Sequence, residues 1–167
     1  MRRKDRKLTD KTDLLAVLDE ADVCRLAIQT GRAPYIVPLN FGYAWDESLV
    51  LYFHSATEGR KLDLLTANGD VGFELDTGHE LVKADLACNW GMKYRSIIGT
   101  GKVSFIEDES EKAAALSVIM RKYRPVSLDG HDKAAGSVEV TEFPVSNLRS
   151  VKMLRLVVEE LSGKQKK

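Results

Sequence analysis

The alternation of apolar and polar residues predicts a chain built mostly of strands, with a few short helices. Apolar residues recur at helical spacing over 11–21. Residues 24–28 alternate with a period of two, as half-buried strands do, and 35–43 and 49–54 are two more strand-like runs. Short polar turns separate these three runs, so we expect the strands to pair antiparallel.

The second half of the chain continues the pattern with longer elements. It predicts a helix that ends at Asn68-Gly69, a strand over 71–75, a strand over 92–106, a helix over 109–123, a loop over 124–136 and a strand region over 145–160. Residues 77–89 are ambiguous because Gly78 and mixed polarity interrupt any period. Gly99 and Gly101 lie inside the long strand, where glycine usually marks a bend or a bulge.

This order of elements favours a mainly β fold, a β-barrel with flanking helices. It contains too few strand–helix–strand crossovers for a doubly wound parallel sheet. Pro34 and Pro38 cannot donate to a strand ladder, so the strand over 35–43 is expected at an edge or at a bulge. The length of 167 residues predicts one domain over 1–167.

Charge and composition narrow the class of protein. The 25 basic and 25 acidic residues cancel, which argues against a general nucleic-acid binder. No apolar run is long enough to span a membrane, and no secretory signal is expected at the start. Two cysteines, Cys24 and Cys88, outside any CxxC spacing favour a reduced, cytoplasmic protein, and the distant histidines give no zinc spacing, so no metal site is expected.

Both ends of the chain are basic. Residues 1–7 and 164–167 carry clusters of Lys and Arg. We expect flexible ends over about 1–8 and 162–167, because chain ends are usually frayed and solvated. The alternative is a weak contact of these ends with an anion or a nucleic acid.

The segment 54–61 carries the clearest chemical signal. A strand ends at His54 and Ser55, Gly59 follows, and Arg60 and Lys61 open a helix. A helix N-terminus with two cations suits a phosphate monoester, because its free N–H groups and partial positive charge attract an anion. Gly59 would let the backbone approach closely, and Arg60 can contact two phosphate oxygens at once. The alternative is a capped helix whose two cations are only solvated.

A resemblance covers about residues 1–123 and, more loosely, the closing strand. The matching stretches are residues 1–6, 24–27, 35–43, 51–56, 59–61, 92–99 and 101–103. With these motifs in this order, the chain resembles the FMN-binding split-barrel superfamily of pyridoxamine 5′-phosphate oxidase-like proteins. Within it, the chain is most similar to the nitroimidazole-resistance branch. The resemblance implies a six-stranded antiparallel split barrel that works as a homodimer, with the flavin at the interface.

The resemblance also implies a set of cofactor-binding residues. Arg60 and Lys61 would hold the FMN phosphate, with Gly59 beside them. A donor to the flavin N5 would come from Leu39 or Asn40, because Pro38 has no N–H; the corresponding strand of the oxidases lacks this proline. The full expected set is Val37, Pro38, Leu39 and Asn40 along the flavin ring, His54 and Ser55 at the ribityl or phosphate end, Gly59, Arg60 and Lys61 at the phosphate, and Tyr94, Arg95 and Ser96 from the second protomer.

The implied activity is that of an FMN-dependent oxidoreductase. A reduced nicotinamide or another donor would reduce the flavin, and a small flat acceptor such as a nitroimidazole would receive the electrons. His54 is the candidate catalytic residue, although a histidine at a strand end can also be purely structural. Oxidation of vitamin B6 is not expected, because Arg149 and Arg155 do not reproduce that enzyme's C-terminal Arg-x-His motif. The alternatives are a flavin or haem carrier without turnover, with His54 or His79 as haem ligand, and a deazaflavin in place of FMN.

Overall fold

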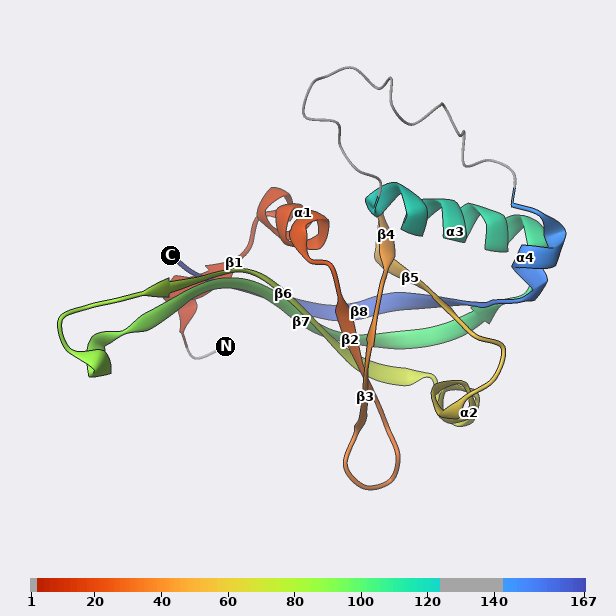
Figure 1. Ribbon diagram of the computed structural model, residues 1–167, viewed down its shortest axis with the longest axis horizontal. Helices are drawn as coiled ribbons and strands as arrows, with labels where there is room; N and C mark the ends of the chain where they lie inside the picture. The colour runs from red at the N-terminus through yellow and green to blue at the C-terminus, as the bar shows by residue number, and fades with distance from the viewer. Residues whose placement is uncertain (1–2, 124–142) are drawn as a thin grey trace, which may run out of the picture.

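The protein is built around one antiparallel sheet, described by a computed structural model for residues 3–123 and 143–167 (Figure 1). The strands are β1 (Lys7–Leu8), β2 (Cys24–Ile28), β3 (Tyr35–Leu39), β4 (Gly42–Trp45), β5 (Leu49–Ser55), β6 (Asp70–Val82), β7 (Gly91–Ile106) and β8 (Lys152–Lys166). The helices are η1 (Lys4–Arg6), α1 (Lys11–Glu20), α2 (Arg60–Ala67), η2 (Ala87–Asn89), α3 (Glu109–Lys122) and α4 (Val145–Arg149). The predicted loop 124–136 lies outside the described residues.

The strand order explains why the sheet closes into a barrel. It runs β3-β2-β6-β7-β8-β5-β4, with β1 paired to β8. β3 and β4 lie at opposite ends of this order, yet only Asn40 and Phe41 separate them in the chain. The sheet must therefore curl round to bring its two edges together, and because β3 and β4 do not pair, the barrel stays split. The predicted mainly β split barrel is confirmed.

The sheet has eight strands, where the sequence predicted six. The predicted strand over 35–43 is divided at Asn40-Phe41 into β3 and β4. Residues 7–8, predicted to be frayed, form β1 against Gly163 and Lys164 of β8. Leu8 is buried there, which ties this end of the chain to the core. Lys7 and Leu8 at one predicted flexible end, and the residues up to Lys166 at the other, are thus part of the sheet.

Two apolar clusters lie on the two faces of the sheet. The larger fills the barrel and is closed by Leu18 of α1 and by Leu62 and Leu65 of α2. The smaller joins α3 to the outer face through Ile119 and Met153. Gly42 permits this second contact, because a Cβ there would lie 2.6 Å from the backbone nitrogen of Ile119.

The hairpin of β6 and β7 projects from the barrel as a long arm (Figure 1). The sequence predicted strand only over 71–75, but β6 continues to Val82 because β7 supplies backbone partners along the whole length. The pairing shifts register between Thr77 and Glu80, next to Gly78 with φ 67°. The predicted strand region over 145–160 begins instead with the helix α4 before β8. None of the helices in the described part of the chain is long and apolar enough to cross a membrane.

Candidate functional site

The turn between β5 and α2 carries a buried hydroxyl without a partner. Ser55 ends β5 on the same face as Leu51 and Phe53, the face against which α2 packs. Its side chain is 6% exposed, and its Oγ has no hydrogen-bond partner among residues 3–123 and 143–167. A buried hydroxyl usually finds a partner, so an unsatisfied one points to a bound group.

The backbone of this turn requires glycine. Gly59 precedes α2 with φ 136° and ψ 158°, a conformation that is essentially restricted to glycine. Its carbonyl accepts the first helical hydrogen bonds, from the N–H groups of Leu62 (2.8 Å) and Asp63 (3.3 Å). No side chain caps the helix, and no atom lies within 4 Å of a Cβ built on Gly59. The first N–H groups of α2 therefore lack a side-chain cap.

Two cations stand at this helix start. Arg60 is exposed and Lys61 is half-buried, and neither forms an ion pair with a carboxylate in the described part of the chain. The Arg60 guanidinium lies over the ring of Tyr35 at the start of β3, 4.8 Å from the ring centroid. The sequence analysis did not select Tyr35 as a site residue. Its only signal was its place at the start of the strand next to the predicted site.

We call Ser55, Gly59, Arg60 and Lys61 the anion cradle. It combines a hydroxyl without a partner, free helix N–H groups and two unneutralised cations. A phosphate monoester needs hydrogen-bond donors and positive charge at one place, and this donor set supplies both. The residues present therefore fit the phosphate end of FMN.

The side chains of β3 alternate between two faces. Val37 and Leu39 are half-buried and pack against the core, whereas Ile36 and Pro38 are exposed. The four predicted residues Val37–Asn40 therefore do not present their side chains to one ligand. A flat ligand along this strand would contact the side chains of Ile36 and Pro38 and the backbone.

The backbone at this edge has a defined polarity. Pro38 lies opposite Arg25 of β2, and Pro38 has no N–H to exchange with it. Because hydrogen-bonded and non-hydrogen-bonded pairs alternate in an antiparallel ladder, Val37 and Leu39 direct their backbone groups toward β2. The N–H and C=O of Ile36 and the C=O of Pro38 face outward from the sheet edge. This leaves one donor and two acceptors for a ligand.

His54, the predicted catalytic residue, and Ser55 point to opposite faces of β5. His54 is exposed and lies opposite Met153 of β8. The His54 imidazole forms no hydrogen bond or ion pair with any other described residue. His79, the other histidine considered, is held by Asp76 at 2.9 Å.

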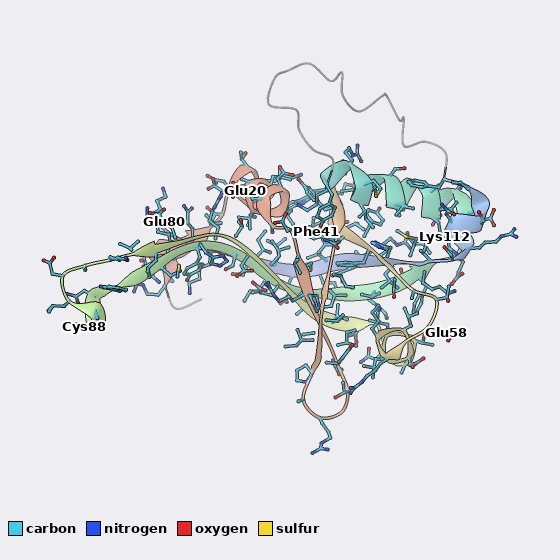
Figure 2. The ribbon with its side chains drawn as sticks, in the orientation of Figure 1. Glu20, Phe41, Glu58, Glu80, Cys88 and Lys112 are labelled. Carbon is cyan, nitrogen blue, oxygen red and sulfur yellow. The ribbon has the colours of Figure 1, made fainter. Side chains whose placement is uncertain are left out.

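Tyr94, Arg95 and Ser96 lie on the arm, far from the anion cradle within one chain. Figure 2 labels Glu58 beside α2 and Glu80 on the arm, and these two residues lie toward opposite ends of the molecule. Glu80 pairs with Lys93, the neighbour of Tyr94. Arg95 forms an ion pair with Glu20 of its own chain. One chain therefore does not bring these three residues to the cradle.

A family model described as pyridoxamine 5′-phosphate oxidase matches residues 10–165. The chain belongs to this family. A solved structure from Bacteroides thetaiotaomicron VPI-5482, named for 5-nitroimidazole antibiotic resistance, is 33% identical to this family member, with a TM-score of 0.75. That match covers 95% of this chain and 86% of the other.

Two more distant structures share the fold of this pyridoxamine 5′-phosphate oxidase family member. An FAD and haem binding protein from Mycobacterium smegmatis is 18% identical, with a TM-score of 0.78, and the match covers 97% of this chain and 74% of the other. An FAD-binding protein from Mesorhizobium loti is 22% identical, with a TM-score of 0.62 and coverage of 97% and 98%. No curated protein matches the chain in sequence.

Proposed function

We propose that this protein is an FMN-dependent oxidoreductase that acts as a homodimer on a small, flat acceptor. The observation that carries the proposal is the anion cradle, where the Ser55 hydroxyl lacks a partner and Arg60 and Lys61 lack carboxylates among the described residues. An unpaired buried hydroxyl is costly unless a ligand satisfies it, and the two cations would attract an anionic ligand. A phosphate dianion would do so.

The chain's own residues would bind and orient the cofactor. The cradle would hold the phosphate, and the outward N–H and C=O of Ile36 with the C=O of Pro38 would meet the polar edge of the ring. FMN, when bound, supplies the hydride and electron transfer. Exposed His54 is available to donate a proton to the reduced acceptor, the role in which we propose it as the catalytic residue.

A nitroaromatic is the acceptor class that we favour. The support is the 33% identical relative that is named for 5-nitroimidazole resistance. A nitro group is reduced to an amine in successive steps that each consume reducing equivalents, which a reduced nicotinamide would provide. No outward charge on β3 would oppose the stacking of a flat, neutral ring, because Ile36 and Pro38 form its exposed surface.

The homodimer is supported by the arm. Five large apolar side chains are exposed on it: Leu81, Val82, Leu86, Trp90 and Met92. Exposed apolar patches of this kind mark interaction surfaces. Tyr94, Arg95 and Ser96 lie in β7, directly after the exposed Met92. An arm packed on a partner would therefore carry these residues to the partner's flavin. A small acceptor would then bind in a groove shared by both protomers.

The decisive experiment compares two charge-reversed proteins. We expect Arg60→Glu/Lys61→Glu to lose FMN, measured by the flavin absorbance of the purified protein and by titration of the apoprotein. The matched control Arg32→Glu/Lys102→Glu reverses two exposed cations elsewhere and should keep full flavin occupancy. Bleaching of the wild-type flavin by a reduced nicotinamide, followed by reoxidation with a nitroimidazole, tests turnover. Full FMN occupancy in the cradle variant would contradict the proposal.

The alternative function is a flavin or haem carrier without turnover. It is favoured by one observation, that the His54 imidazole is exposed and has no partner in the described part of the chain. A Soret band that disappears in His54→Ala but persists in His79→Ala would support haem binding. The mass of the extracted chromophore distinguishes FMN from haem, FAD or a deazaflavin.

A further inference from the structure

A second concentration of positive charge lies where the two ends of the chain meet. An open pocket of about 500 Å³ is lined there by residues of η1 and β1 and by the end of β8. Its lining includes five basic residues, Arg3, Arg6, Lys7, Lys166 and Lys167, but only two acidic ones, Asp5 and Asp13. This pocket lies near the N and C labels of Figure 1, away from α2. We call it the terminal pocket.

The carboxylates that line the terminal pocket neutralise only part of its positive charge. Asp5 accepts two hydrogen bonds from Arg3, at 2.9 Å and 2.7 Å, which lowers the pKa of Asp5 to about 2. This carboxylate is therefore already engaged, and Arg6 reaches it only at 4.0 Å. Lys7 and Lys166 form no ion pair with any carboxylate in residues 3–123 and 143–167. The pocket keeps a net positive charge.

The strand pairing places Lys7 of the pocket against a further cation next to the pocket lining. Lys7 of β1 lies directly opposite Lys164 of β8. Like charges directly opposite in an antiparallel pair destabilise it. Two residues further along the same face, Lys166 lies opposite Tyr94. If only stability mattered, a carboxylate would be favoured at position 7, 164 or 166. The lysines found there instead point to a requirement for positive charge.

The pKa of the Tyr94 hydroxyl reflects the positive charge of these neighbouring cations. Hydrogen bonds to Lys164 and Arg6 lower the pKa of Tyr94 below its ordinary value. The Lys164 ammonium also lies 5.6 Å from the centre of the Tyr94 ring. The phenol therefore provides a spectroscopic probe at the edge of the pocket.

We propose that the terminal pocket binds the phosphate group of a small phosphorylated molecule. Arg6 and Lys166 are the main contacts, with Lys7 and Arg3 beside them. The guanidinium and ammonium groups match phosphate oxygens, and the pocket is large enough for a diphosphate with part of its ester. The overall charge balance of the chain favours a small anion over a nucleic acid. Within one chain, this site is separate from the anion cradle.

Isothermal titration with inorganic pyrophosphate at low salt tests the proposal. We expect Arg6→Gln/Lys166→Gln to bind pyrophosphate about tenfold or more weakly, because two charge-assisted contacts are lost. The matched control Lys4→Gln/Lys102→Gln removes two exposed cations outside the pocket and should bind like wild type. Arg60→Gln/Lys61→Gln should keep this binding, which separates the terminal pocket from the anion cradle.

A second readout follows the phenol itself. Absorbance titration, with Tyr94→Phe to assign the signal, should show the pKa of Tyr94 rising when pyrophosphate binds or when Arg6 is neutralised. Circular dichroism and thermal melting check that the variants fold, and the relief of repulsion should preserve their stability. The proposal is overturned if Arg6→Gln/Lys166→Gln binds pyrophosphate like wild type, or if only the Arg60→Gln/Lys61→Gln protein loses it. Binding of a single-stranded oligonucleotide in place of pyrophosphate would also overturn it.

Discussion

The guanidinium carbon of Arg60 lies 4.8 Å from the centre of the Tyr35 ring, which links the start of α2 to the start of β3. The contact holds the Arg60 side chain of the anion cradle beside β3, the strand proposed to carry the flavin ring. We expect Tyr35→Leu to weaken FMN binding a few-fold, because a cation–π contact at an exposed site contributes about 0.5–1 kcal/mol. Tyr35→Phe keeps the ring and should bind like wild type in fluorescence titrations. If Tyr35→Leu and Tyr35→Phe bound FMN with equal affinity, the ring contact would not position Arg60.

Gly59 offers a test of the backbone of the cradle. Gly59→Ala forces a Cβ onto a residue with φ 136°, so we expect a loss of about 1–3 kcal/mol in unfolding free energy or a rearranged turn with weaker FMN binding. The control is Gly72→Ala, where the nearest atom would lie at an ordinary 3.8 Å and φ is not positive. Urea denaturation of both proteins measures the difference. Equal stability would show that the turn tolerates a side chain.

The arm gives a direct test of the proposed homodimer. Leu81 and Met92 lie opposite each other and are 48% and 42% exposed. Leu81→Glu/Met92→Lys should produce monomers in sedimentation velocity, because it removes apolar surface. The new pair can form an ion pair like its neighbour Glu80–Lys93, at 3.0 Å, so the hairpin should stay folded. Ile98→Lys changes an exposed residue off the arm and should leave the dimer intact. If Leu81→Glu/Met92→Lys stayed dimeric and Ile98→Lys became monomeric, the interface would lie off the arm.

Arg155 is expected to lower the stability of the fold. Its Nε is buried in β8 and has no hydrogen-bond partner among the described residues. A buried unsatisfied donor costs about 1–3 kcal/mol, so we expect Arg155→Met to melt at the same temperature as wild type or higher. In contrast, Arg25→Met should melt lower, because Arg25 bonds Glu74 at 2.9 Å and Asp76 at 2.8 Å. A marked destabilisation by Arg155→Met would indicate that its guanidinium is satisfied in solution.

Asp108 should make the stability of α3 depend on pH. Hydrogen bonds from the Ser110 hydroxyl and the Glu111 N–H lower the pKa of this N-cap carboxyl below its ordinary value. A carboxyl whose pKa is lower in the folded state stabilises the protein above its unfolded pKa, and this contribution disappears as the pH falls through the folded pKa. At neutral pH, Asp108→Ala should melt a few degrees lower than wild type. Asp108→Asn keeps the cap without charge, so its difference from wild type should vanish in acid.

Local periodicity was sufficient to predict elements such as β2 and α1. The alternation in Cys24–Ile28 and the helical spacing in Lys11–Glu20 arise from burial on one side, which the sequence records directly. The break between β3 and β4 has another origin. The Phe41 N–H donates to the Tyr123 hydroxyl at 3.0 Å, and this distant contact leaves no local pattern.

The same distinction applies to the anion cradle. The run of Gly59, Arg60 and Lys61 was visible in the sequence because adjacent residues at a helix start share one location. The buried state of Ser55 and the contact of Arg60 with Tyr35 depend on how α2 packs on the barrel. The arm was missed for a related reason, because both faces of β6 beyond Thr77 are exposed and the pairing with β7 determines the strand.

The place of β8 has a consequence for synthesis of the protein in the cell. This strand lies between β5 and β7 and also pairs with β1, although it follows all the other strands in the chain. Until residues 152–166 leave the ribosome, β5 and β7 each have an unpaired edge, and such edges invite association between nascent chains. The barrel therefore closes only after residues 152–166 have left the ribosome, and a ribosome that stalls earlier would present the unpaired edges of β5 and β7 to chaperones.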